Sequence, residues 1–107
     1  MTSVTVVGTA RLRAGRADEA RKLITSMVER SRREPGCLSH EAHEAVGDPL
    51  TLVLIEKWAS QQDLDSHNQE PWLAESLGQL IELLTGAPEI QVFTPLGHGT
   101  ADQDTPR

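Results

Sequence analysis

The sequence is poor in the residues that most often carry covalent or redox chemistry. Its 107 residues include no tyrosine, one phenylalanine and a single cysteine, Cys37. Cys37 has no partner for a disulfide within the chain, and its place beside a turn favours an apolar packing role over a nucleophilic one. The patterns G-x-S-x-G, G-x-G-x-x-G, C-x-x-C and H-E-x-x-H are missing too, as is a Walker loop. The common hydrolase, nucleotide-binding and zinc-protease sites are therefore not indicated.

Positive charge and long apolar runs are also scarce. The formal net charge is −6, and the only basic cluster is Arg30, Arg32 and Arg33 near the expected end of a helix, where cations are favoured. Nucleic-acid binding needs a gathered positive surface and is not predicted. No segment approaches the roughly 20 apolar residues of a membrane span, and no signal peptide opens the chain. We expect a soluble, cytoplasmic protein.

The periodicity of the apolar residues predicts two helices and four strands in the order β-α-β-β-α-β. Alternation indicates strands and a 3.6-residue repeat indicates helices. The predicted segments are strands at 3–13, 37–46, 50–58 and 89–95, and helices at 17–34 and 60–84 with a break at Pro71. Two right-handed crossovers on an antiparallel four-stranded sheet give a ferredoxin-like α+β fold. We expect one domain over residues 1–96 and a disordered tail over 97–107.

Helices in such a fold cover only one face of the sheet. The first strand nevertheless carries valines on both sides, and the third carries Leu and Ile on both sides. A second copy of the chain is the simplest cover for an apolar face in so short a protein. We therefore predict a homodimer.

The candidate chemistry is concentrated between Leu54 and Trp72. Ser60 can cap the helix that follows it by accepting from the Asp63 amide. Pro71 cannot donate to the carbonyl of His67, so the helix should break there and leave that carbonyl free. This corner, which also holds Asn68, is a plausible mouth for a pocket.

Two further groups of side chains can be placed by strand alternation. Glu56 and Trp58 share one side of their strand with Leu52 and Leu54, and His40 shares a side with Leu38. His40, Glu56 and Trp58 are thus either core residues or substrate contacts. His40 and His43 should point to opposite faces, so no shared metal is predicted.

The residues Glu34-Pro-Gly-Cys-Leu-Ser, Leu54-Ile-Glu-Lys-Trp58 and Leu64-Asp-Ser-His67, followed by Pro71, resemble the antibiotic biosynthesis monooxygenase (ABM) domain family. The resemblance covers residues 3–96. It implies a dimeric α+β barrel and, in many members, oxygenation of quinols, anthrones or related polyketide aromatics without metal or flavin. It leaves open a haem-degrading relative and a non-catalytic dimeric protein that binds small molecules.

The resemblance also bears on the catalytic residues. Asn68 and Trp72 are similar to the Asn-x-x-x-Trp of the anthrone-oxidising members, which place a tyrosine after the tryptophan, whereas this chain has Gly78 nearby. Because histidine side chains in general can act as acids or bases between pH 5 and 8, His67 is the leading base by elimination. The Asn68 amide could bond a substrate anion, and Trp72 could stack on a flat ring. Helix capping and packing are the alternative roles of these three residues.

Overall fold

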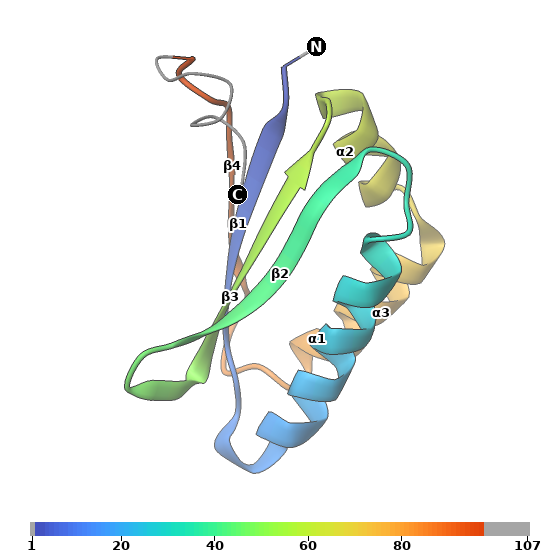
Figure 1. The fold of residues 1–107 in the computed structure, drawn as a ribbon. Coiled ribbons are helices and arrows are strands. Elements are labelled where there is room, and N and C mark those ends of the chain that lie inside the picture. Colours follow the sequence, from blue (N-terminus) through green and yellow to red (C-terminus); the bar gives the residue numbers. More distant parts are fainter. Residues whose placement is uncertain (1, 98–107) are drawn as a thin grey trace.

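The computed structural model describes residues 2–97, which form a single sheet with helices packed on one face (Figure 1). The elements are β1 (Val4–Arg11), a 3-10 turn η1 (Ala14–Arg16), α1 (Ala17–Ser31), β2 (Cys37–Ala45), β3 (Asp48–Trp58), α2 (Gln61–Asn68), α3 (Pro71–Ile81) and β4 (Glu89–Phe93). The sheet order is β2-β3-β1-β4, with every neighbouring pair antiparallel. This is the predicted ferredoxin-like α+β fold. All of the predicted tail except Gly97 lies outside the described residues, so its disorder stays a prediction.

Helix α1 supplies much of the core because its apolar residues recur every three or four positions. Asp18 and Glu19 lie in the first turn, where negative charge is favoured, and Ile24 and Met27 are buried on the face toward the sheet. The helix ends at Ser31, three residues before the predicted end. The amide of Glu34 instead bonds the carbonyl of Ser31 in a tight turn.

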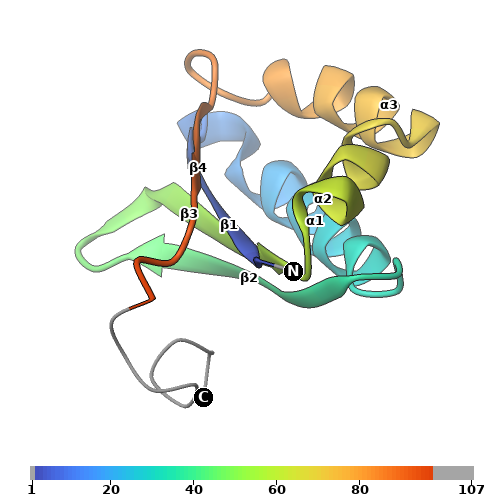
Figure 2. The same ribbon diagram turned by 90° about the horizontal axis from the view of Figure 1, so that it is seen from above.

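Strand β3 alternates as predicted, and its inner face points toward the helices. Leu52 and Trp58 are buried, with Trp58 at 0% exposure. Trp58 packs with Val4, Val6 and Leu64 in a small cluster at the α2 end of the sheet. The larger cluster lies between the sheet and helices α1 and α3 (Figure 2).

Strand β2 departs from simple alternation. Cys37 pairs with Trp58 and Ser39 with Lys57, so Leu38 is an extra residue that forms a bulge. The bulge reverses the side on which Leu38 points, so Leu38 is 56% exposed while His40 is buried at 3%. The prediction that His40 shares a face with Leu38 is therefore wrong, because one inserted residue shifts the period-two pattern.

The C-terminal end of α3 also differs from its prediction. The helix stops at Ile81, which is 53% exposed rather than on the buried face. Leu83 and Leu84 are buried all the same. The carbonyl of Leu83 accepts from the Arg13 amide, and Leu84 forms a bridge with Leu12. Pairing with the end of β1 replaces the last helical turn. No helix within residues 2–97 is long and apolar enough to cross a membrane.

Gly36 turns the chain from α1 into β2. Its φ of +82° lies in the left-handed region, and a Cβ built there would come within 2.2 Å of the Asp63 side chain. Its carbonyl accepts from the Ala59 amide at 2.8 Å. This glycine thus holds the end of α1 against the start of α2.

We predict that Gly36→Ala lowers the free energy of unfolding by about 1–3 kcal/mol or more, because it adds backbone strain and a steric clash. Gly78→Ala is the matched control. Gly78 lies inside α3 with open space around it, so this change should be neutral or stabilise by up to about 1 kcal/mol. Urea unfolding of both variants measures the difference, and equal stabilities would contradict the role of Gly36.

Candidate functional site

A cavity of about 140 Å³ lies between the sheet and the helices. Its walls are mostly apolar. Val6 and Leu54 come from the sheet, while Met27, Leu73 and Leu77 come from α1 and α3. Such a cavity favours an apolar ligand.

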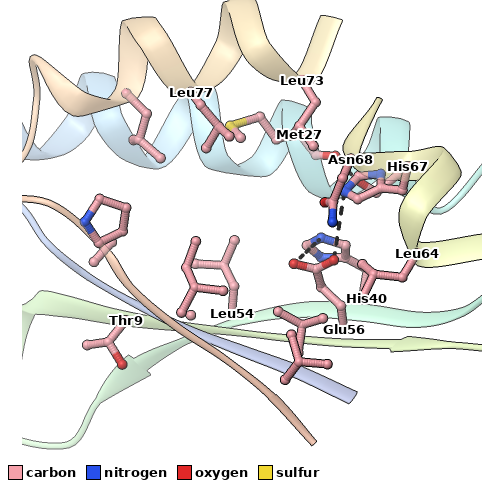
Figure 3. Close-up of a pocket in the computed structure, with 18 residues that line it drawn as sticks. Thr9, Met27, His40, Leu54, Glu56, Leu64, His67, Asn68, Leu73 and Leu77 are labelled. Atoms are coloured by element: carbon pink, nitrogen blue, oxygen red, sulfur yellow. Dashed lines mark hydrogen bonds and ion pairs between the residues drawn. The ribbon is translucent and has the colours of Figure 1, made fainter. Parts of the chain in front are cut away.

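Polar side chains are gathered at one end of this cavity (Figure 3). They are His40 from β2, Glu56 from β3, and His67 and Asn68 from α2. His40 is the cross-strand partner of Glu56, and it faces inward because of the bulge at Leu38. The sheet thus places one imidazole beside a carboxylate, and α2 places a second imidazole over the same carboxylate.

The turn between α2 and α3 fixes His67. The Ser60 hydroxyl accepts from the Asp63 amide at 3.1 Å, which is the predicted N-terminal cap. Pro71 opens α3 as its first residue, as predicted. The prediction of a free His67 carbonyl is wrong, because this carbonyl accepts from the Glu70 amide at 3.1 Å. A tighter turn therefore supplies the hydrogen bond to the His67 carbonyl that Pro71 cannot donate.

His67 lies between two carboxylates. Its Nδ1 is 2.9 Å from Glu34 Oε1, and its Nε2 is 3.8 Å from Glu56 Oε1. The ring is also packed between two indoles, with centroid distances of 4.6 Å to Trp58 and 5.9 Å to Trp72. Because the ring is held on every side, its nitrogens keep a fixed direction.

Each indole bonds one of these carboxylates. Trp58 Nε1 donates to Glu56 Oε1 at 3.0 Å, and Trp72 Nε1 donates to Glu34 Oε2 at 3.2 Å. Such bonds compensate in part for the removal of a carboxylate from water. The second oxygen of Glu56, Oε2, faces His40 Nε2 at 3.7 Å, which is longer than a hydrogen bond.

Burial changes the titration of two groups at the polar end. Burial raises the pKa of Glu56, partly offset by the Trp58 bond and the nearby His67. Burial also lowers the pKa of His40 to about 4, and the charges of His67 and Arg32 act in the same direction. His40 is therefore a neutral imidazole at pH 7.

One nitrogen of His40 has no partner. Nδ1 is buried and makes no hydrogen bond within the described residues. We place the ring proton on Nε2, which faces the Glu56 carboxylate, so Nδ1 carries a lone pair. A buried acceptor without a donor is uncommon in folded proteins and often marks a functional site.

The predicted site residues divide into two groups. His40, Glu56, His67 and Asn68 line the cavity, whereas neither tryptophan is among its lining residues. Asn68 is exposed, and its side chain makes no hydrogen bond to the rest of the described chain.

Glu34 is the residue that sequence reasoning missed. The local pattern indicates only a helix terminator there, yet Glu34 bonds both His67 and Trp72 across 33 and 38 positions of the chain. No local spacing could have indicated these contacts.

His40 and His43 point to opposite faces of β2, as predicted. His40 is buried, whereas the side chain of His43 is 53% exposed. Within residues 2–97, no three His, Cys, Asp or Glu side chains are placed to hold a metal ion.

Cys37 packs beside this site rather than in it. It contacts the cluster around Trp58. Burial raises the pKa of its thiol, and the charges of Glu56 and Glu34 add to the effect. A thiol with a raised pKa stays protonated near neutrality and is a poor nucleophile, in line with the predicted packing role.

The buried His40 predicts a pH-dependent stability. Its pKa falls from the ordinary value of 6.5 to about 4 in the folded chain, so the unfolded chain takes up the proton first as the pH falls. His40 therefore has little effect on the free energy of unfolding above pH 6.5, and it lowers this free energy increasingly as the pH falls toward 4. Between pH 7 and pH 5, the native chain should lose about 2 kcal/mol more unfolding free energy than a His40→Gln variant.

Urea unfolding of the two proteins at both pH values measures this difference. The raised pKa of Glu56 acts in the opposite direction but is present in both proteins. Parallel pH profiles would show that His40 is not held in its neutral form.

Comparison with known proteins gives relatives of similar fold. "Putative monooxygenase Rv0793" from Mycobacterium tuberculosis is 35% identical over 81 residues, which are 76% of this chain and 79% of the relative. The solved structure of Rv0793 superposes with a TM-score of 0.84 at 30% identity, covering 92% of this chain and all (100%) of that one.

This chain is also similar to more distant relatives. "Uncharacterized protein sll1783" from Synechocystis is 28% identical over 84% of this chain, and the aligned region spans only 61% of that protein. A conserved protein from Methanosarcina mazei superposes with a TM-score of 0.82 at 25% identity, covering 87% of this chain and 92% of that one. The sequence profile of the Antibiotic biosynthesis monooxygenase (ABM) family matches residues 3–75. With the fold and the profile in agreement, this chain belongs to the ABM family.

Proposed function

We propose that this protein is a cofactor-independent monooxygenase that oxidises a quinol, an anthrone or a related polyketide aromatic with dioxygen. The observation that carries the proposal is the cavity, whose apolar body ends at a partly buried carboxylate beside a neutral imidazole. The body suits a flat ring, and the polar end suits a hydroxyl group that must lose its proton. Membership of the ABM family supports the reaction class.

The reaction needs an electron-rich anion. Ground-state dioxygen is a triplet and reacts slowly with closed-shell molecules, so the substrate must first be deprotonated and then give up one electron. For a hydroquinone, one quinol and one dioxygen give a hydroxyquinone and water. One oxygen atom replaces a ring hydrogen, and the other leaves as water. The substrate supplies all four electrons, so no external reductant is required.

Glu56 and His67 together form the proposed base. Glu56 lines the cavity, and its raised pKa favours proton uptake from a substrate hydroxyl. His67 lies 3.8 Å away, held by Glu34, and can stabilise the proton on the pair. His67, which the sequence predicts as the base by elimination, therefore acts together with Glu56 in this proposal.

Asn68 and the tryptophans take different roles. The Asn68 amide lines the cavity and can donate to the oxygen on which negative charge develops. The sequence predicts that Trp72 stacks on the substrate, but its bond to Glu34 and its absence from the lining of the cavity support a positioning role. Trp58 holds Glu56 in the same way.

We also propose that the protein is a homodimer that pairs through the sheet face opposite the helices. Figures 1 and 2 show the helices on one side of the sheet only. On the other side, the cross-strand neighbours Val7 and Ile55 lie near the centre, and Phe93 near one edge is 46% exposed. An apolar face of this kind is commonly covered by a second copy.

The dimer is tested by sedimentation equilibrium. The native protein should have twice the 11.7 kDa mass of the chain at micromolar concentration. Ile55→Glu should shift it toward the monomer because a charge would be buried at the centre of the interface. Ile81→Glu is the control, since Ile81 is exposed on the helix side. A native monomer would contradict the proposal.

The function is tested by dioxygen uptake with metal-free protein and a panel of hydroquinones and anthrones. Given an active substrate, Asn68→Ala should lower turnover by about 10- to 1,000-fold with little change in KM, because one donor to the developing anion is lost. Gln69→Ala is the matched control, as Gln69 is exposed and does not line the cavity.

Two outcomes would contradict this account. Normal turnover of Asn68→Ala would remove Asn68 from the mechanism. A lack of dioxygen uptake with every compound would favour a protein that binds small molecules without oxidising them.

A further inference from the structure

We infer that the ligand of this cavity is an uncharged phenol with a single aromatic ring, whose hydroxyl group donates to the polar end. The inference rests on the proposed function and narrows its substrate class. It is carried by the size of the cavity, by its apolar walls and by a buried acceptor that has no partner.

The size argues for one ring. The cavity has a volume of about 140 Å³. An engineered apolar cavity of about 150 Å³ in another protein binds benzene, whereas pockets for larger organic ligands usually have about 300–1,000 Å³. A three-ring anthrone therefore cannot be enclosed without movement of the walls. Leu77 and Leu73 on α3 face Leu54 on β3 across the space and limit it (Figure 3).

The polar end argues for a hydroxyl donor. His40 Nδ1 is buried and has no hydrogen-bond partner within residues 2–97. It is an acceptor, so a ligand O–H satisfies it while an ether or a ketone does not. An ether in this place would leave Nδ1 unpaired.

The charge at this end argues against acids. Two carboxylates, Glu34 and Glu56, flank His67, and Glu56 itself forms part of the cavity wall. A carboxylate ligand would be placed next to Glu56 in an apolar surrounding, where like charges repel strongly. The net charge of −6 opposes the approach of anions as well.

Calorimetric titration without dioxygen tests the inference with four probes. They are p-cresol, 4-methylanisole, 4-methylbenzoate and 9-phenanthrol, which is a three-ring phenol. We expect p-cresol to bind at least about 10-fold more tightly than 4-methylanisole and 4-methylbenzoate, since one buried donor or charge typically changes affinity by this factor or more. We expect the same margin over 9-phenanthrol, because its three rings exceed the cavity of about 140 Å³. Equal binding of 4-methylanisole would overturn the hydroxyl assignment. Tighter binding of 9-phenanthrol would overturn the size limit.

A variant with a larger cavity tests the size argument through an increase in the affinity for the three-ring phenol. Leu77→Ala should raise the affinity for 9-phenanthrol about 10-fold or more relative to p-cresol, because it removes a wall side chain. Leu38→Ala is the matched control, since Leu38 is 56% exposed and does not line the cavity. An unchanged ratio in a folded Leu77→Ala protein would show that Leu77 does not limit the ligand.

The ligand class and the oxygenase proposal can be contradicted independently of each other. If p-cresol binds as expected but no phenol or quinol consumes dioxygen, the ligand class stands and the oxygenase proposal fails. If anthrones are oxidised and single-ring phenols neither bind nor react, the ligand class fails and the oxygenase proposal stands.

Discussion

The structure depends on the burial of His67 between Glu34 and Glu56. Two carboxylates beneath a helix layer would be strongly destabilising if they were left unpaired. The imidazole contacts one at 2.9 Å and the other at 3.8 Å, while each indole N–H bonds one of them. Three parts of the chain are joined by this network: the turn after α1, the C-terminal half of β3, and α2 with its turn into α3. Removal of His67 would leave both carboxylates without the imidazole that lies between them.

The same network gives the cavity its chemistry. Because Trp58 occupies one oxygen of Glu56, the other oxygen is left toward His40 and the cavity. His40 stays neutral because its surroundings are poor in water and already hold positive groups. The result is a carboxylate and a neutral imidazole at the end of an apolar space. We propose that they serve as a base and a hydrogen-bond acceptor for a phenolic substrate.

Much of the fold could be predicted because it follows from local periodicity. The alternation in β1 and β3, the apolar stripe of α1 and the break at Pro71 each depend on neighbouring residues alone. The errors have causes that local periodicity does not encode. The bulge at Leu38 moves one residue out of register, and the last turn of α3 is replaced by pairing with β1. Both changes are set by the partner strand and not by the sequence of the segment itself.

The sequence by itself determined the order of the elements and most of their apolar faces, and it indicated His67, Asn68, Glu56 and His40 among the candidate site residues. It did not determine which of them meet. Tertiary structure placed these four at one end of a cavity, left both indoles out of its lining, and brought Glu34 against His67 from 33 positions away in the chain. The physical reason is that strand register and helix packing are decided by burial over the whole sheet. A local pattern can say which face a side chain takes, but only the packed chain decides what lies opposite.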